Sequence, residues 1–516
     1  MRYLALPIED ESPTCVLVAT DTAFGCTGYV GMKSKFETCA QPIRFTAIGL
    51  RCAVASAAVV LVGMLFEPIP AQALPAYARQ TGQPCATCHN GAFPQLTSYG
   101  REFKINGYVS GGRTCSFDRS AAAYAANAEP VIPLSAMVVG TFTHTQADQE
   151  SLPTNRKGDL NGLGVNDNWM AQDSSVFLAG QIVCNIGAFM QATYDRNDQA
   201  FFLDNTDFRM TDRRRIGDVD SVFGLTVNNN PSVEDPWNTT PAWRIPGGGS
   251  ITSAFAPGTA APMVDSLGGV VAGVGAYAWL NNSLYVSLSN YRVLDDKTLQ
   301  ALGEGPPPGF QFDGPAPYWR VALEKNWGDF SLMVGTYGMH ASVIPDETQQ
   351  SPNDSFTDIG YDTQFQYLRG KHFFTGRISY ETENSTLTGS QFLGNSDNTK
   401  DWLHQFNISG TYAYDSTYSA TLGYFDTRGS TDHQLYAVTA GLPTVGGSPN
   451  TRGEFLELGY SPFSKGGPRI YPWFNTRIGL QYWHYDQING GSINYDGAGR
   501  NASGDNTVIL YSWTAF

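Results

Sequence analysis

From Leu134 onward, apolar and polar side chains alternate along the chain in one run after another. In the first run, one face carries Leu134, Ala136, Val138, Gly140 and Phe142. A period of two indicates a β-strand, because successive side chains of a strand point to opposite faces. We find 16 such segments before the C-terminus, each close to the roughly 9 to 11 residues that a tilted transmembrane strand needs. The pattern therefore predicts a fold dominated by membrane-spanning strands.

The connections between these segments favour a closed barrel. Short ones, such as Asn281–Asn282, alternate with long ones, such as Gln146–Asp173 and Asn228–Leu267. Single-chain bacterial barrels have an even number of strands, with short turns in the periplasm and long loops outside. The count is even only if His433–Gly441 belongs to a long outer loop. We therefore expect an all-β fold, a transmembrane antiparallel β-barrel of about 16 strands over residues 134–516. A soluble β-helix or propeller is the alternative, but no repeat of fixed period appears.

Composition agrees with a barrel and disagrees with a bundle of membrane helices. Hydrophobic residues make up 42% of the chain and charged residues only 15%, while mean hydropathy is −0.23. A helical bundle would need several apolar runs of about 20 residues, whereas a barrel hides its apolar surface by alternation. The formal net charge is −15. Such an acidic chain is a poor candidate for binding nucleic acid, but it can attract a cation.

The first 73 residues predict a secretory leader. An apolar run, Cys52–Phe66, follows Arg44 and Arg51 and precedes the small-residue triplet Ala71-Gln72-Ala73. This order is typical of a signal peptide cleaved after Ala73, with an uncleaved anchor as the alternative. Residues 1–31 carry charges of both signs and read as an error in the assigned start site, since a more natural leader begins at Met32. Removal of the leader leaves 27 basic and 41 acidic residues, so the net charge of the mature chain stays near −14.

The strongest chemical motif follows the cleavage site. Cys85-Ala86-Thr87-Cys88-His89 has the C-x-x-C-H spacing in which two thiols bond to haem vinyl groups and the histidine ligates the iron. A zinc half-site or a thiol redox pair is the alternative, but no second pair of ligands follows at zinc spacing. The remaining mature cysteines, Cys115 and Cys184, are expected to form a disulfide in an oxidising compartment.

The segment around the motif predicts a small haem domain, residues 74–112, joined to the barrel by a tether, residues 113–133. A helix is expected after Pro94, with Leu96, Tyr99 and Phe103 as one wall of a haem pocket and Gly107 at its end. A unit below about 40 residues rarely builds its own core, so the haem must supply much of it, and docking against or inside the barrel the rest. We therefore expect the haem domain on the periplasmic side of the outer membrane or inside the barrel lumen.

The sequence signals for other haem contacts are less specific than the C-x-x-C-H motif. Haem propionates could pair with Arg79, Arg101 and Lys104, which would be equally ordinary as surface charges. No methionine or second histidine lies between Leu74 and Gly107, so a sixth iron ligand must come from elsewhere. Met137 and Met333, which face inward by parity, are the candidates, with simple packing as the alternative role.

The residues from Leu74 to Tyr108 closely resemble the cytochrome motif of the fused monohaem cytochrome-porins, the outer-membrane iron oxidases of iron-oxidising bacteria. The resemblance rests on Leu74-Pro75-Ala76-Tyr77-Ala78-Arg79-Gln80-Thr81-Gly82, the C-x-x-C-H motif, Pro94, Leu96, Tyr99-Gly100-Arg101, Phe103-Lys104 and Gly107-Tyr108. The barrel matches in length, strand count and style only. The resemblance implies an outer-membrane protein with one covalent haem c, Fe(II) as electron donor, and a periplasmic cytochrome c or cupredoxin as acceptor.

Two other functions stay open at this point. The protein could be a transport porin whose haem domain is a plug or redox gate. It could equally be an electron conduit for a donor other than iron, such as copper, a sulfur compound or a partner protein.

Overall fold

The computed structural model describes residues 69–70, 74–91, 94–109, 133–148, 165–183, 185–195, 200–243, 260–303, 308–436, 446–467 and 471–516. The predicted cleavage point after Ala73, most of the predicted tether and the predicted Cys115–Cys184 disulfide lie outside these residues. Within the described parts of the chain, no helix is long and apolar enough to cross a membrane.

Most of the described chain is strand. The long strands are β2 (Leu134–Thr145), β3 (Asn168–Val183), β4 (Ile186–Asp195), β5 (Ala200–Ile216), β6 (Val219–Asn228), β7 (Val271–Leu280), β8 (Leu284–Val293), β10 (Ala316–Trp327), β11 (Phe330–Ile344), β12 (Asp354–Arg369), β13 (His372–Thr386), β14 (Lys400–Tyr414), β15 (Tyr418–Gly429), β16 (Thr451–Tyr460), β18 (Asn475–Gln487) and β19 (Thr507–Ala515). Short strands are β1 (Ile69–Pro70), β9 (Gln311–Phe312) and β17 (Gly466–Gly467). The helices are α2 (Pro75–Thr81), α3 (Cys85–Cys88), α4 (Ser98–Ile105), α6 (Asp296–Ala301) and α7 (Thr388–Phe392).

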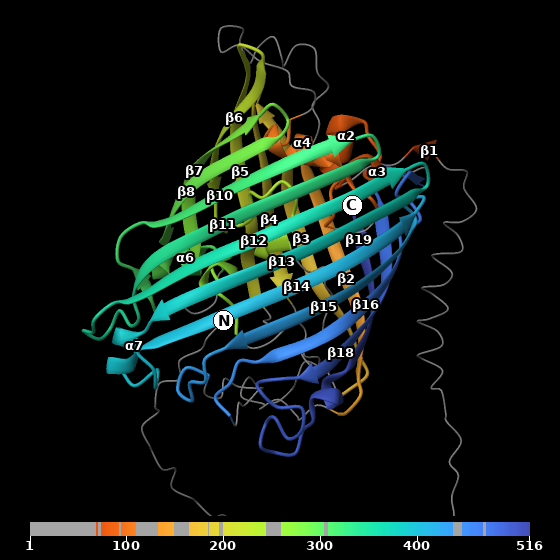
Figure 1. The fold of residues 1–516 in the computed structure, drawn as a ribbon. Helices are drawn as coiled ribbons and strands as arrows, with labels where there is room; N and C mark the ends of the chain where they lie inside the picture. Colours follow the sequence, from red (N-terminus) through yellow and green to blue (C-terminus); the bar gives the residue numbers. More distant parts are fainter. Residues whose placement is uncertain are drawn as a thin grey trace, which may run out of the picture. The chain divides into compact units, whose positions relative to one another are not determined.

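Among the described residues, the sixteen long strands form one closed antiparallel ring (Figure 1). Each strand pairs with its neighbour in the chain, β8 pairs with β10 across the short β9, and β16 pairs with β18. The last strand, β19, pairs with the first, β2, and closes the ring. Closure leaves no long free edge, which is what allows strands to span a membrane. The predicted architecture and strand number are confirmed.

The two faces of the wall differ as a transmembrane barrel requires. Leucine and valine side chains such as Leu288, Leu323 and Leu422 are exposed on the outward face. The inward positions beside them are small and polar, as at Ser287 and Ser289. Outward aromatic residues gather where the strands meet the short turns. Phe330 contacts both Trp327 and Tyr367, and Tyr418 contacts Tyr460. An apolar band bordered by aromatic side chains is typical of barrels in a lipid bilayer.

Several strands are longer than the sequence predicted. Predicted segments of about ten residues become strands of 15 to 17 residues at β5, β11, β12 and β13. The prediction was wrong in length because it counted only residues that cross the bilayer. Backbone pairing between neighbours continues past the apolar band, as in the unbroken register from Arg369–His372 to Ser355–Thr386.

The described N-terminal segment, residues 74–91 and 94–109, lies inside the ring. Its residues form hydrogen bonds with β2, β3, β4, β5, β7, β10, β11, β12, β13, β14 and β18. Partners spread around the ring can all be reached only from the interior. Most of them, such as Ser135, Tyr277 and Gln366, lie near the short-turn ends of their strands. The segment therefore fills the short-turn end of the lumen, and Figure 1 shows α2, α3 and α4 near one end of the strands with α7 at the other.

A second segment, residues 229–243 between β6 and β7, also folds inward. Its residues Glu234, Asp235 and Trp237 are fully buried. The Trp237 indole donates a hydrogen bond to Glu324 of β10, and the Asn238 amide donates to the carbonyl of Pro94. The loop thus meets the N-terminal segment within the barrel. An unfilled barrel of this size would enclose an aqueous channel, but here two chain segments occupy much of the lumen.

Candidate functional site

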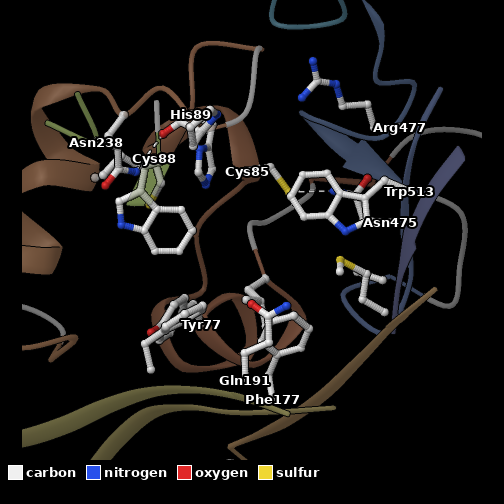
Figure 2. A pocket seen from close by; sticks show the side chains of 18 of the residues that line it. Tyr77, Cys85, Cys88, His89, Phe177, Gln191, Asn238, Asn475, Arg477 and Trp513 are labelled. Atoms are coloured by element: carbon white, nitrogen blue, oxygen red, sulfur yellow. Dashed lines mark hydrogen bonds between the residues drawn. The ribbon is translucent and has the colours of Figure 1, made fainter. Parts of the chain in front are cut away.

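A cavity of about 410 Å³ lies where the N-terminal segment faces the barrel wall. This is within the range of roughly 300 to 1,000 Å³ that is usual for pockets of small molecules and cofactors. Cys85, Cys88 and His89 border the cavity, and Arg477 and Trp513 of the barrel lie across from His89 (Figure 2). The wall is mostly apolar, because Leu96, Phe103 and several barrel residues line it.

Two short helices set the positions of the cysteines. Both thiols belong to the single turn α3 and are buried as free cysteines. Helix α4 packs directly on this turn at Gly100, where an added Cβ would meet the carbonyl oxygen of Cys88 at 2.4 Å. Thr97 caps α4 by accepting a hydrogen bond from the Gly100 N–H. The C-x-x-C turn is therefore held from one side by a close backbone contact that only glycine allows.

His89 is oriented by a hydrogen bond from its ring. Its Nδ1 lies 3.2 Å from the carbonyl oxygen of Gln95. A carbonyl oxygen only accepts, so Nδ1 carries the hydrogen and the lone pair is on Nε2. The Gln95 side chain is in turn fixed by a 2.8 Å hydrogen bond to Thr411 of β14. Burial lowers the pKa of His89 to about 4, so its imidazole is neutral at physiological pH.

This arrangement fits a covalent c-type haem. Two thiols and one neutral imidazole lie within the five residues Cys85–His89, beside one mostly apolar cavity. The hydrogen bond from Nδ1 to a backbone carbonyl is the usual support of a metal-ligating histidine, because it fixes the tautomer and the ring orientation. Burial raises the pKa of the Cys88 thiol to about 12 and raises that of the Cys85 thiol further. Both thiols are therefore protonated at physiological pH, whereas a thiol redox pair needs a reactive thiolate.

Of the three predicted propionate partners, Lys104 borders the cavity. Its Nζ donates to the backbone oxygen of Asp235 at 2.8 Å and to Oδ1 of Asn238 at 2.9 Å. Burial lowers the pKa of Lys104 to about 7. An anionic group placed beside it would favour the charged ammonium. Lys104 is therefore a suitable partner for a propionate, although this role stays a prediction.

The two arginines lie off the cavity. Arg79 stacks on the ring of Trp473, 4.1 Å from its centroid, and donates to the carbonyl of Leu134. Arg101 is buried and donates two hydrogen bonds, of 3.0 and 2.7 Å, to the carboxylate of Glu324 in β10. It also donates to Gln366 of β12 at 2.7 Å. Both arginines thus attach the N-terminal segment to the barrel, and neither borders the cavity.

The two candidates for the sixth iron ligand lie in different parts of the structure. Met137 of β2 borders the cavity. Met333 of β11 packs in another cluster, with Ile105, Trp237 and Trp279 among its members, and is not a cavity residue. Iron ligation by a methionine stays a prediction, which the geometry narrows to Met137.

One predicted wall residue is misplaced. Leu96 and Phe103 line the cavity, but Tyr99 does not, and 41% of its surface is exposed. The prediction was wrong because the helix begins at Ser98, after Leu96, and turns Gly100 and Phe103 toward the C-x-x-C turn. Tyr99 then lies to one side of that face.

The sequence did not reveal which residues of the barrel line the cavity. Arg477 of β18 is buried there and pairs with Glu457 of β16. Trp243 comes from the inward loop, and Trp513 from β19. A signal for Arg477 existed, since a charged residue stood at an inward position of a predicted strand. Its nearness to the haem motif depends on ring closure, which local pattern does not encode.

Comparison with known proteins finds no protein-family model that matches the chain and no curated protein that is significantly similar to it. Among solved structures, a loop-deletion mutant of the outer membrane protein OmpT of Vibrio cholerae is 8% identical, covers 74% of this chain and 98% of its own, and has a TM-score of 0.39. The channel DcaP of Acinetobacter baumannii is 13% identical over 74% and 96% of the chains, with a TM-score of 0.39. The anion-selective porin from Comamonas acidovorans is 9% identical over 74% and 98%, also with a TM-score of 0.39. At these identities and TM-scores, the similarity carries no information on function.

Proposed function

We propose that this protein is an outer-membrane electron conduit that oxidises extracellular Fe(II) and delivers the electron to a periplasmic cytochrome c or cupredoxin. One observation carries the proposal: the C-x-x-C-H motif opens onto a cavity inside a closed barrel, and the Nδ1 of His89 is held by the carbonyl oxygen of Gln95. The choice of iron rests on the resemblance of residues 74–108 to the cytochrome-porins.

The residues of the chain have separate tasks in this proposal. Cys85 and Cys88 would bond the haem vinyl groups, and His89 Nε2 would ligate its iron. Lys104 would hold a propionate, and Met137 is the candidate for the sixth position. The bound haem would supply a centre that is reduced and reoxidised by one electron. Arg101 with Glu324, and Gly100 with the Cys88 carbonyl, fix the segment that carries these groups.

The position of the segment supports a route between two compartments. It fills the short-turn end of the lumen, which in barrels of this kind faces the periplasm. A haem held there would be within reach of a periplasmic carrier. Toward the other end, Asp173 of β3 and Asp204 of β5 line the same cavity. Carboxylates at that side would favour a cation as the donor.

The transport-porin alternative is weaker for a specific reason. Solute flux needs an open lumen, whereas residues 74–109 and 229–243 occupy it and are tied to each other and to the wall. Opening would require several buried hydrogen bonds and the Arg101–Glu324 pair to break together.

Stopped-flow spectroscopy of the purified protein tests the proposal. Mass spectrometry should first find haem on the peptide that contains Cys85 and Cys88. Fe(II) should then reduce the haem faster than copper(I), thiosulfate or sulfide at equal concentration. Reduction by another donor alone would keep the conduit and exclude iron, and the absence of covalent haem would contradict the conduit.

A further inference from the structure

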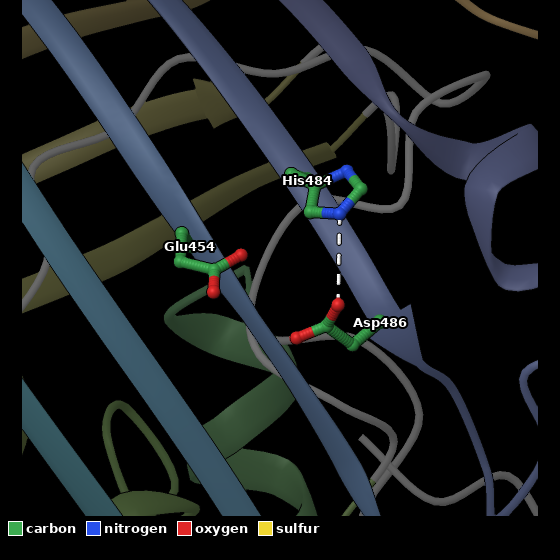
Figure 3. A group of neighbouring side chains, drawn as sticks. All are labelled: Glu454, His484 and Asp486. Carbon is green, nitrogen blue, oxygen red and sulfur yellow. Dashed lines mark ion pairs between the residues drawn. The ribbon is translucent and has the colours of Figure 1, made fainter.

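A second group of metal-ligating side chains lies on the outer face of the barrel, away from the haem cavity. Glu454 projects from β16, and His484 and Asp486 project from the neighbouring β18 (Figure 3). One ligand atom from each lies within 4.8 Å of the other two. The Nε2 of His484 lies 3.6 Å from Oδ1 of Asp486.

The position of this group follows from the strand pattern. In β16 and β18, residues such as Phe455 and Trp483 point inward and are buried, so Glu454 and His484 point outward. The two residues are direct partners in the β16–β18 pairing. All three ligands lie near the ends of their strands that join the longer connections. By the usual orientation of outer-membrane barrels, that end faces the cell exterior.

A β-bulge brings the third ligand close. Gly453 pairs with Tyr485 and Arg452 pairs with Gln487, so Asp486 is an extra residue in β18 without an opposite partner. In a regular strand, residues two apart are separated by about 6.6 Å. Bulges bend the strand locally and often redirect a side chain near functional sites. Here the bulge falls at the residue that completes the group.

We propose that Glu454, His484 and Asp486 form a binding site for a divalent first-row transition-metal ion at the outer rim of the barrel. An imidazole nitrogen with two carboxylate oxygens suits Zn²⁺ or Fe²⁺, whereas Mg²⁺ and Ca²⁺ prefer oxygen ligands alone. Three protein ligands leave further coordination positions to water. The site is independent of the haem and of the proposed iron oxidation.

Isothermal titration of the full-length, detergent-solubilised protein with ZnCl₂ tests this site. We expect one saturable site that persists in excess Mg²⁺. It should disappear in His484→Ala and weaken in Asp486→Asn and Glu454→Gln. The matched control is His340→Ala, because His340 is also exposed on an outward strand position but its Nδ1 contacts Thr357 Oγ1.

Each outcome decides the matter. Loss of the site in His484→Ala with retention in His340→Ala supports it. Retention in His484→Ala, loss in both variants, displacement by Mg²⁺, or no site in the native protein contradicts it. Heat-modifiable migration in SDS gels, which reports a folded barrel, must match the native protein for every variant that is counted.

Discussion

At the residue scale, His89 of the C-x-x-C-H motif is held by Gln95, and Gln95 is held by the barrel wall. C-x-x-C-H is a local pattern with one dominant chemical meaning, so the sequence predicts Cys85, Cys88 and His89 as the haem-binding residues. The hydrogen bond from His89 to Gln95 is local, but Gln95 is in turn anchored on Thr411, which lies far along the chain in β14. The Gln95–Thr411 contact depends on the assembled barrel, so no local sequence pattern predicts it.

Gly100 gives a sharp test of this support. A Cβ at this position would meet the Cys88 carbonyl oxygen at 2.4 Å, so Gly100→Ala must push α4 away from the C-x-x-C turn. We expect less haem per protein, measured as the ratio of haem to protein absorbance. Gly376→Ala is the control, because its Cβ would lie an ordinary 3.6 Å from Phe374. Equal haem content in the two variants would show that the close contact does not matter.

The methionines give a second test at this scale. If Met137 is the sixth ligand, Met137→Ala should remove the near-infrared band of methionine-ligated ferric haem and lower the reduction potential. Met333→Ala should change neither, since Met333 packs outside the cavity. A native haem that is already high-spin and five-coordinate would exclude both residues.

At the scale of elements, the strands were predictable from the sequence, but the inward fold of residues 229–243 was not. Each strand carries an alternation of apolar and polar residues with period two. The number of such segments, together with the alternation of short and long connections, predicted the closed ring of sixteen strands. Residues 229–243 were read as part of a long outer loop because they lack alternation. They fold inward because their polar groups find buried partners, such as Asp362 for Thr239 and Glu324 for Trp237.

The attachment of α4 to the wall can be tested through Glu324. Glu324→Gln leaves the Arg101 guanidinium buried beside a neutral side chain. Breaking a buried ion pair in this way typically costs about 3 to 5 kcal/mol. We expect residues 74–109 to become sensitive to protease while the barrel stays folded. The exposed neighbour Lys325 supplies the control, Lys325→Gln, which should keep native resistance. Equal protection in both variants would argue against this anchor.

The Cys115–Cys184 disulfide remains a prediction at the same scale. Such a bond would pin the tether to the barrel rim. Titration of the denatured, unreduced protein should find no free thiol from these two cysteines, and two titratable thiols would contradict the pairing.

At the scale of the whole molecule, the barrel encloses the C-x-x-C-H motif and its cavity, and in the proposed function it isolates a redox site within a membrane. Its outward face is apolar, two chain segments occupy much of its lumen, and the C-x-x-C-H motif lies toward the short-turn end. Sequence predicted the two parts separately. The sequence left open whether the small domain lies on the periplasmic side or inside the barrel lumen. Contacts with strands all around the ring place residues 74–91 and 94–109 in the lumen.

The most direct test of the central claim uses sealed vesicles that contain the purified protein and enclose an oxidised cytochrome c. Fe(II) added outside should reduce the enclosed cytochrome, with no leak of a small neutral solute, and His89→Ala should abolish the reduction while its barrel stays folded. Reduction that persists in His89→Ala, or solute flux without electron transfer in the native protein, would contradict the conduit.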